Sequence, residues 1–425
     1  MPSWLMPAGL GVLAMGAAAT AAGKKAGWNR EPNHADLAPQ FRIGSRVRVL
    51  RAFEELEEIR DIWSDWAETP DADFDVFRTV LECGSDPAQP RVMVVERCGN
   101  PDAIWIASLS TTTLNEKIAY LNVPMPRVRL LNSVYGGFLG NQSRENSELI
   151  AQELRQSLNR GEADVTVFRY LREDAPLHAV ITNTRSSLIR DHFRATHSHS
   201  FMALPDRAEA IYAGLSKEHR WKLRRDARRF REAFAHLTVV RFDSTHRLQE
   251  MFQDAEAIAA TTYQRGLGVG FSDTRPIREL LRLEAEKGWL RGYILYAGGR
   301  PCAFWIGCVY GGKFLSEYLG HDPAYAKHSP GNYILTSAME DLCREGVKAI
   351  DFGFGEAQYK QRFGTDHRHE RTIYVYAPTW PGIRARAART TAMLINSAGK
   401  AVLRRANLGG RIKKMWRQRV AHPSS

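Results

Sequence analysis

The chain has 425 residues, of which 44% are hydrophobic and 25% charged, as is typical of a soluble globular protein with two or three domains. It carries 59 Lys and Arg against 47 Asp and Glu, yet residues 371–425 hold twelve of these basic residues and no acid. The body before residue 371 is therefore neutral, which excludes a fold that binds nucleic acid over its whole surface.

The N-terminal residues lack the pattern of a secretory signal. Residues 5–22 carry no charge but are rich in Ala and Gly, no Lys or Arg precedes them, and Lys24 and Lys25 follow. We expect residues 1–40 to be a disordered or weakly apolar extension, with a weak anchor or signal as the alternative. We predict that the body is cytoplasmic, and that it lies at the inner face of the membrane if the segment is an anchor.

The patterns of apolar residues predict one order of elements twice. In the first half they predict strands at 46–50, 91–98, 103–109, 128–135 and 164–170, and helices at 52–66 and 147–158. In the second half they predict strands at 237–242, 290–296, 302–310, 313–319, 348–352 and 373–376, and helices at 247–262 and 331–345. We therefore expect two copies of one α/β unit, at 41–205 and 206–380, followed by a basic tail at 381–425.

Each unit contains a strand–helix–strand step, which needs a crossover and predicts a parallel pair of strands. The other predicted pairs are antiparallel hairpins. Where a sheet changes from antiparallel to parallel pairing, neighbouring strands can separate and leave a slot for a ligand.

The loop GHDPAYAKHSPGNYIL, residues 320–335, joins a predicted strand to a predicted helix. Ser329 fits the N-cap, with a proline at the first helical position. The backbone N–H groups of Gly331, Asn332 and Tyr333 would then point at the loop, and Lys327 adds positive charge. Such a helix end suits a pyrophosphate, while an ordinary capped helix is the alternative.

The segment DFGFGEAQYKQRFG, residues 351–364, follows the next predicted strand. Asp351 ends that strand, and the glycines allow a sharp turn. Tyr359 and Phe363 are four residues apart, so they share one face of a short helix, while Lys360 points toward the end of the sheet. Asp351, Lys360 and Arg362 are the functional candidates, against a glycine-rich turn with solvated basic side chains.

Glu317 lies among leucines in the strand KFLSEYLG. Strict alternation puts Phe314, Ser316 and Tyr318 on one face and Leu315, Glu317 and Leu319 on the other. A buried carboxylate is costly unless it is used or paired, and burial raises its pKa toward that of a general base. The alternative is an edge-strand Glu in water.

Two basic segments remain. Residues 215–230 form a helical pattern whose polar face carries Arg220 and Arg224, suited to an anionic substrate or to solvent alone. Residues 384–420 include a basic amphipathic pattern around Leu408 and Trp416, suited to an anionic membrane, to RNA phosphates or to packing on the body.

Metal and nucleophile motifs are lacking. His192, His197 and His199 have no Cys or carboxylate at ligand spacing, so no metal is expected. The five cysteines are scattered without a CxxC pair, which favours a reducing compartment.

In this order, the helix at 215–230, the loop at 320–335 and the segment 351–364 resemble the GNAT-fold acyltransferases of the CelD type, relatives of the Fem-type peptidoglycan aminoacyltransferases. The resemblance covers about residues 215–377, and the first half only through the repeat. It implies a tandem GNAT fold (α/β, α+β), each unit a mixed, mostly antiparallel sheet flanked by helices. It also implies transfer of an acyl group, expected to be acetyl, from CoA to an amine or hydroxyl.

By position, the resemblance assigns Lys327 to Asn332 to the pyrophosphate loop, and it places Glu317 where some GNAT enzymes carry a general base. Lys360 matches the family's closing motif. The expected catalytic residues are Glu317, Asp351, Tyr359 and Lys360. The expected acetyl-CoA-binding residues are Lys327, Ser329, Gly331, Asn332 and Tyr333. The expected substrate-binding residues are Arg220, Arg224 and Arg362.

Three functions compete. The first is acyl-CoA-dependent transfer to a small-molecule or saccharide acceptor in exopolysaccharide or envelope synthesis. The second is an aminoacyl-tRNA-dependent transferase of the Fem type, which the basic tail and the arginine-rich helix favour. The third is a non-catalytic scaffold at a membrane surface.

Overall fold

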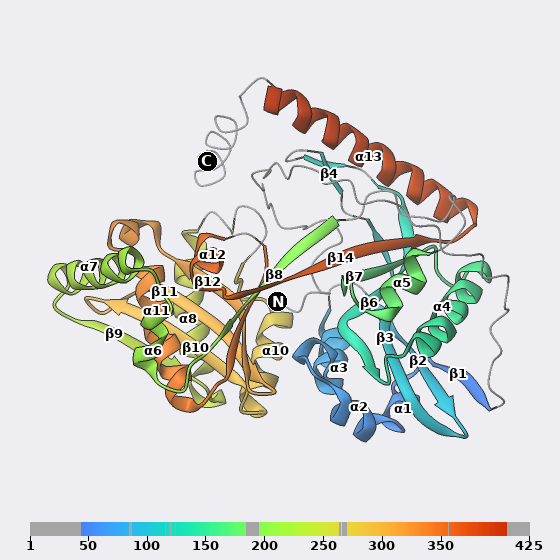
Figure 1. Ribbon diagram of the computed structural model, residues 1–425, viewed down its shortest axis with the longest axis horizontal. Coiled ribbons are helices and arrows are strands. Elements are labelled where there is room, and N and C mark those ends of the chain that lie inside the picture. Colours follow the sequence, from blue (N-terminus) through green and yellow to red (C-terminus); the bar gives the residue numbers. More distant parts are fainter. Residues whose placement is uncertain are drawn as a thin grey trace, which may run out of the picture.

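The computed structural model describes residues 44–84, 87–114, 116–118, 121–123, 125–183, 195–262, 265, 270–355 and 357–405 (Figure 1). The predicted extension at 1–40, His192 and the tail beyond residue 405 lie outside these ranges.

The fold is built on one twelve-stranded sheet in the order β1-β2-β3-β6-β7-β14-β8-β13-β12-β11-β10-β9. The first half supplies β1 (Ser45–Leu50), β2 (Ala88–Arg97), β3 (Asn100–Thr113), β6 (Arg127–Gly140), β7 (Val165–Arg172) and β8 (Ala195–Ala203). The second half supplies β9 (Leu237–Phe242), β10 (Leu290–Ala297), β11 (Arg300–Tyr310), β12 (Lys313–His321), β13 (Ala349–Phe354) and β14 (Asp366–Tyr376). The short strands β4 (Glu116–Ile118) and β5 (Leu121–Val123) form a separate hairpin.

The two halves repeat the same topology, which confirms the tandem fold expected from the sequence. β6 with β7 and β12 with β13 are the parallel pairs among the described strands, and the other pairs are antiparallel. Both parallel pairs fall at the predicted crossovers.

The last strands of the two halves are exchanged. β8 comes from the first half but pairs with β13, whereas β14 comes from the second half and pairs with β7. β8 and β14 also pair with each other. The sheet therefore runs without interruption across residue 205, the predicted boundary between the units, and its centre is made of strands from both halves.

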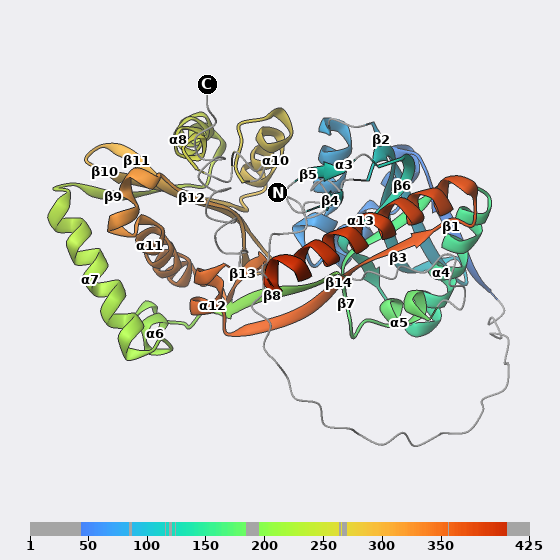
Figure 2. The same cartoon turned by 90° about the horizontal axis from the view of Figure 1, so that it is seen from above.

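Helices cover both faces of the sheet, as Figure 2 shows from above. One face carries α1 (Phe53–Glu57), α2 (Arg60–Trp66), η1 (Pro70–Ala72), α3 (Phe74–Cys83), η2 (Thr245–Arg247), α8 (Leu248–Ala260) and α10 (Arg275–Glu286). The other carries α4 (Arg144–Asn159), α5 (Pro176–Thr182), α6 (Ala208–Ala213), α7 (Lys217–Ala233), η3 (Pro323–His328), α11 (Pro330–Glu345) and α12 (Gln358–Phe363). The long α13 (Trp380–Arg405) packs on the first half through Ala385, against Tyr374 and Tyr376 of β14.

The two halves also meet on the face that carries α10. Leu280 of α10 is buried in the core beneath α3, and Lys287 forms an ion pair with Asp75. Tyr310 of β11 hydrogen-bonds Asp73, the N-cap residue of α3, at 3.3 Å. The position of α10 over its own sheet is therefore fixed partly by the first half.

Candidate functional site

The second half contains the separated strands that the sequence predicts. β12 and β13 pair only from Lys313–Ala349 to Leu315–Asp351. Beyond these pairs, no hydrogen bond among the described residues joins 316–321 to 352–354, so the two strands diverge. In the first half, Arg169 of β7 donates from Nε to Asn132 Oδ1 of β6 at 2.8 Å, which bridges the equivalent strands. The second half therefore offers the better candidate slot.

A β-bulge at the slot places Glu317. Ile306 pairs with Tyr318 and Gly307 pairs with Ser316, so Glu317 has no partner on β11. A side chain at 307 would not fit, because a Cβ there would lie 1.9 Å from the carbonyl oxygen of Leu315. Gly307 thus lets the two backbones approach at the bulge.

The bulge corrects the predicted alternation. Phe314 packs in the core beneath α11, as expected, but Tyr318 packs in the core beneath α8 and α10, while Leu319 returns to the α11 side. The prediction that Tyr318 shares a face with Phe314 is wrong, because the extra residue shifts the register of every later side chain.

Glu317 lies in a polar group on the α10 side of the sheet. Glu317 shares this group with Glu284 of α10 and Cys308 of β11. One carboxyl oxygen of each glutamate and the sulfur of Cys308 lie within 4.8 Å of one another. The Oε2 atom of Glu317 is buried and has no hydrogen-bond partner. The sequence predicted a carboxylate among apolar residues here, but it did not predict Glu284.

Asp351 enters a network that crosses the strand exchange. His199 Nε2 on β8 lies 2.5 Å from Asp351 Oδ1, and His199 Nδ1 lies 3.3 Å from Glu370 Oε1 on β14. Tyr135 of β6 donates to the same Glu370 oxygen at 3.3 Å. The network joins strands of both halves at the middle of the sheet.

Burial and hydrogen bonding oppose each other at His199. Burial lowers the pKa of the imidazole, but the bonds to Asp351 and Glu370 raise it more, to about 9. His199 is therefore an imidazolium at neutral pH, held between two carboxylates. Only its position on one strand face signalled it in the sequence, because both acids come from distant parts of the chain.

Lys360 closes the turn after β13. Its Nζ atom donates to the carbonyl oxygen of Phe354 at 2.6 Å, and burial lowers its pKa to about 8 against the opposing attraction of Asp351. Gly353 has a φ of +70°, and a Cβ there would lie 3.9 Å from Nζ. The structure thus brings Lys360 and Asp351 together at the end of β13, where the sequence expected them.

The other residues of this motif lie on either side of Lys360. Tyr359 packs edge-on against Phe352, with ring centroids 5.8 Å apart, and Phe363 is buried in the same core. Arg362 is exposed beside His219 of α7. Tyr359 and Phe363 thus share a face, as predicted.

The loop before α11 has the predicted backbone with an unexpected neighbour. Ser329 is the N-cap residue and proline follows it, but its φ of 55° is left-handed and its side chain does not cap the helix. Instead Ser329 Oγ donates to Asp226 Oδ2 of α7 at 3.3 Å. Arg225 pairs with Asp226 at 2.9 Å and compensates its charge. Lys327 is exposed, and the other predicted donor-binding residues, Gly331, Asn332 and Tyr333, form the first turn of α11 and are partly buried.

The arginine-rich α7 presents a basic surface with an aromatic side chain. Arg224 is exposed and Arg220 partly so. Trp221, between them in the sequence, is 60% exposed, with the Arg225 guanidinium 4.7 Å from its ring. Arg220 and Arg224 do not approach Glu317 or Asp351 through any contact of the described residues.

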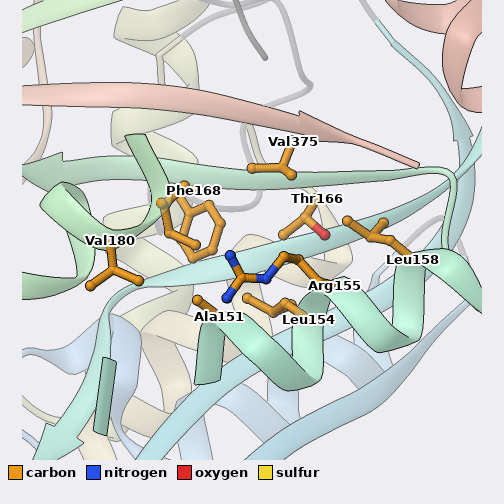
Figure 3. Close-up of a pocket in the computed structure, with 9 residues that line it drawn as sticks. Ala151, Leu154, Arg155, Leu158, Thr166, Phe168, Val180 and Val375 are labelled. Carbon is orange, nitrogen blue, oxygen red and sulfur yellow. The ribbon is translucent and has the colours of Figure 1, made fainter. Parts of the chain in front are cut away.

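A small pocket, of about 20 Å³, lies between α4, α5, β7 and β14, away from these residues. Figure 3 shows Arg155 of α4 extending toward Thr166 and Phe168 of β7. The residues that line the pocket are Ala151, Leu154, Arg155, Leu158, Thr166, Phe168, Val180, Ile181 and Val375. None of the predicted site residues is among them.

Within the described parts of the chain, no helix has the length and apolar character needed to cross a membrane.

Comparison with known proteins identifies the second unit. Residues 217–361 match the family described as acetyltransferase (GNAT) domain, and the fold of this part of the chain is GNAT-like. The match begins in α7 and ends in α12, and it includes Glu317, Asp351 and Lys360. No curated protein matches the chain.

Solved structures resemble the chain at low sequence identity. FemX is 12% identical, with a TM-score of 0.50 over 76% of this chain and 96% of FemX. A tandem GNAT protein from the clavulanic acid biosynthesis pathway is 9% identical, with a TM-score of 0.45 over 79% of this chain and 99% of that one. A conserved protein from Bacteroides thetaiotaomicron is 12% identical, with a TM-score of 0.47 over 75% and 97% of the two chains. The likeness to FemX shows a common fold.

Proposed function

We propose that the protein is an acyltransferase of the CelD type that moves an acyl group, acetyl in the first instance, from acyl-CoA to an amine or hydroxyl. The observation that carries the proposal is the pair of diverging strands in the GNAT domain, with Glu317 on one strand and Asp351 on the other. Beyond Leu315 and Asp351 the two strands do not pair with each other, so backbone groups on the facing edge of β12 could bind an extended ligand.

The donor fits this slot and the adjacent helix end. The pantetheine chain of acyl-CoA has amides that can bond the exposed edges of β12 and β13. Its pyrophosphate would lie at the start of α11, near Lys327 and the backbone N–H of Gly331, because those of Asn332 and Tyr333 donate to Ser329. A Cβ at Gly331 would make only an ordinary contact, 3.7 Å from His321 Nδ1, so no side chain crowds the backbone at this position.

The reaction is a direct transfer. The acceptor nitrogen or oxygen bonds to the thioester carbonyl carbon, and Glu317 takes the proton that the acceptor loses. The tetrahedral intermediate then breaks its carbon–sulfur bond and releases CoA thiolate, which takes up a proton. The buried ammonium of Lys360, in the closing motif, would stabilise the negative charge that develops on the thioester carbonyl oxygen. Asp351 holds His199 and the turn at Gly353, so its role is to position this end of the slot.

The test is thermal unfolding of the full chain with acetyl-CoA, free CoA or total tRNA, followed by release of CoA thiol in an acceptor screen. A saturable rise of the melting temperature with CoA is expected. Glu317→Gln should keep that rise but lose CoA release, whereas the control Glu286→Gln, which changes a helix-end residue, should keep both. No stabilisation by acetyl-CoA or CoA at any concentration would contradict the proposal.

A second function is favoured by the surface of α7. An exposed tryptophan beside Arg220 and Arg224 can stack a base while the guanidinium groups bind phosphates. This supports an aminoacyl-tRNA donor as the alternative. Salt-sensitive stabilisation by tRNA that Trp221→Ala removes, without stabilisation by CoA, would favour it.

The setting of the reaction is a separate proposal. We infer a saccharide or other small acceptor in exopolysaccharide or envelope synthesis, in the cytoplasm and close to an anionic membrane that residues 384–420 contact. Exposed Trp380, Leu394 and Ile395 on α13, among basic residues, support that contact. Co-sedimentation with vesicles of phosphatidylglycerol, and its loss on Trp380→Ser, tests it; equal binding by both proteins would contradict it.

A further inference from the structure

Two buried carboxyl groups face each other where α10 crosses β12. Glu284 on α10 is only 1% exposed, and Glu317 lies on the bulge of β12. Their carboxyl oxygens are within 4.8 Å of each other. The Oε2 atom of each of these two residues is buried and has no hydrogen-bond partner.

No cation compensates this pair within the described part of the chain. No Lys, Arg or His there forms an ion pair or a hydrogen bond with either carboxyl. Among the described residues, the other titratable groups that act on the pair are Cys308 of β11, Tyr318 of β12 and Asp71 of η1. Two ionised carboxylates at this distance, without water or a cation, would repel each other strongly.

The electrostatics identify which group holds a proton. Burial raises the pKa of Glu284 well above its ordinary value, and the charge of Glu317 raises it further. Burial likewise raises the pKa of the Cys308 thiol, which keeps the sulfur protonated. The neutral carboxyl of Glu284 can then donate to Glu317, as in other carboxyl pairs that share one proton.

We propose that Glu284 is a positioning residue that shares one proton with Glu317 and thereby fixes the place of the Glu317 carboxyl on the strand that borders the slot. The inference rests on the proposed function, in which Glu317 takes the proton of the acceptor. Because α10 packs against α3, the first unit fixes the position of Glu284. The first unit therefore contributes to the chemistry of the second without touching the substrate.

The first experiment requires no activity. Infrared spectra of the full chain at pH 7 should show the carbonyl band of a buried protonated carboxylic acid, which is absent in Glu284→Gln. Stability should respond as well. Glu284 has a folded pKa above its unfolded value, so its contribution to stability is lost as pH rises above about 4.5 toward the folded pKa. The glutamine variant should lack that decline. A spectrum in which Glu284→Gln removes no such band overturns the proposal.

The second experiment measures positioning. Glu284→Gln keeps a neutral hydrogen-bond donor at this position. Because the amide can replace the bond to Glu317, kcat/KM should stay within about threefold of the parent. Glu284→Leu removes the donor and leaves Glu317 desolvated, so kcat/KM should fall about 10- to 100-fold and the acid limb of its pH profile should move to higher pH. A Glu284→Leu profile identical to the parent overturns the proposal, as does equal damage by both variants at unchanged melting temperature.

Metal binding is the competing result. Stabilisation of the parent by Zn²⁺ or Mn²⁺ alone, lost in both Glu284→Gln and Cys308→Ala, would mean that the group is a cation site and would overturn proton sharing. The proton-sharing pair and the acyltransferase activity can be rejected independently of each other. An infrared band assigned to Glu284 in a protein that neither binds CoA nor releases it rejects the acyltransferase while the proton-sharing pair stands.

Discussion

His199 Nε2 lies 2.5 Å from Asp351 Oδ1, and this contact joins a strand of the first half to the strand that borders the slot of the second. Glu370 holds the other ring nitrogen of the same imidazole at 3.3 Å. The end of β13, where Asp351 and Gly353 shape the slot, is therefore supported by residues from both halves.

Removing this imidazole should destabilise the whole protein. His199→Gln would leave Asp351 and Glu370 buried without their cation, and breaking a buried pair in this way costs about 3–5 kcal/mol. Urea unfolding followed by circular dichroism measures the change. His369→Gln, an exposed change on β14, is the control and should alter the unfolding free energy by less than about 0.5 kcal/mol. An equally stable His199→Gln would contradict the role given to this network.

The contribution of His199 should depend on pH. Its folded pKa of about 9 lies above the ordinary value of 6.5, so the stabilisation is complete below pH 6.5 and is lost as pH rises through 9. The difference in unfolding free energy between the parent and His199→Gln should therefore shrink between pH 6.5 and pH 9. A difference that grows over this range would show that the imidazole is neutral in the folded protein.

Lys360 should matter more for catalysis than for stability. Burial lowers its pKa to about 8, so its charged form costs the folded protein stability below pH 8, and that cost is relieved as pH rises from 8 toward 10.5. Lys360→Met should keep the melting temperature at pH 7 within a few degrees. It should lower kcat by roughly 10²–10³ if the ammonium stabilises the developing charge. Unchanged kcat in this variant would remove Lys360 from the mechanism.

Gly307 should tolerate no side chain. A Cβ at this position would lie 1.9 Å from the backbone oxygen of Leu315, so Gly307→Ala must distort the bulge. We expect a loss of about 1–3 kcal/mol or more, together with loss of donor binding. Gly312→Asn is the matched control, because nothing lies within 4 Å of its Cβ and Asn accepts its φ of +74°. Equal stability of the two variants would contradict the account of the bulge.

Several strands and helices were predicted close to their observed bounds, because the apolar residues within each one follow the pattern of its buried face. The predicted strand at 237–242 coincides with β9, and the predicted helix at 331–345 differs from α11 by one residue. The predicted helix at 52–66 is divided into α1 and α2, although no Gly or Pro marks the break. Leu56 before the break, Ile59 within it and Trp63 after it are all buried, so packing favours the division.

What the sequence missed depends on partners far along the chain. The bulge at Glu317 is made possible by Gly307 on the neighbouring strand, and no pattern within β12 reveals it. His199 was noticed only as one of several histidines, since its carboxylate partners are 152 and 171 residues away. No helix was predicted over residues 275–286, so nothing in the sequence drew attention to Glu284 on α10. Each of these side chains acquires its role only when the sheet is complete.

The strand exchange has a consequence for the order in which the chain acquires its structure during synthesis. β7 ends at Arg172, but its neighbour β14 begins only at Asp366. At about 5–20 residues per second, translation of the intervening chain takes on the order of 10–40 s. Throughout that interval the open edge of β7 can pair with other strands. While the first half is still bound to the ribosome, this edge therefore stays open, and a chain truncated anywhere before β14 would keep it open.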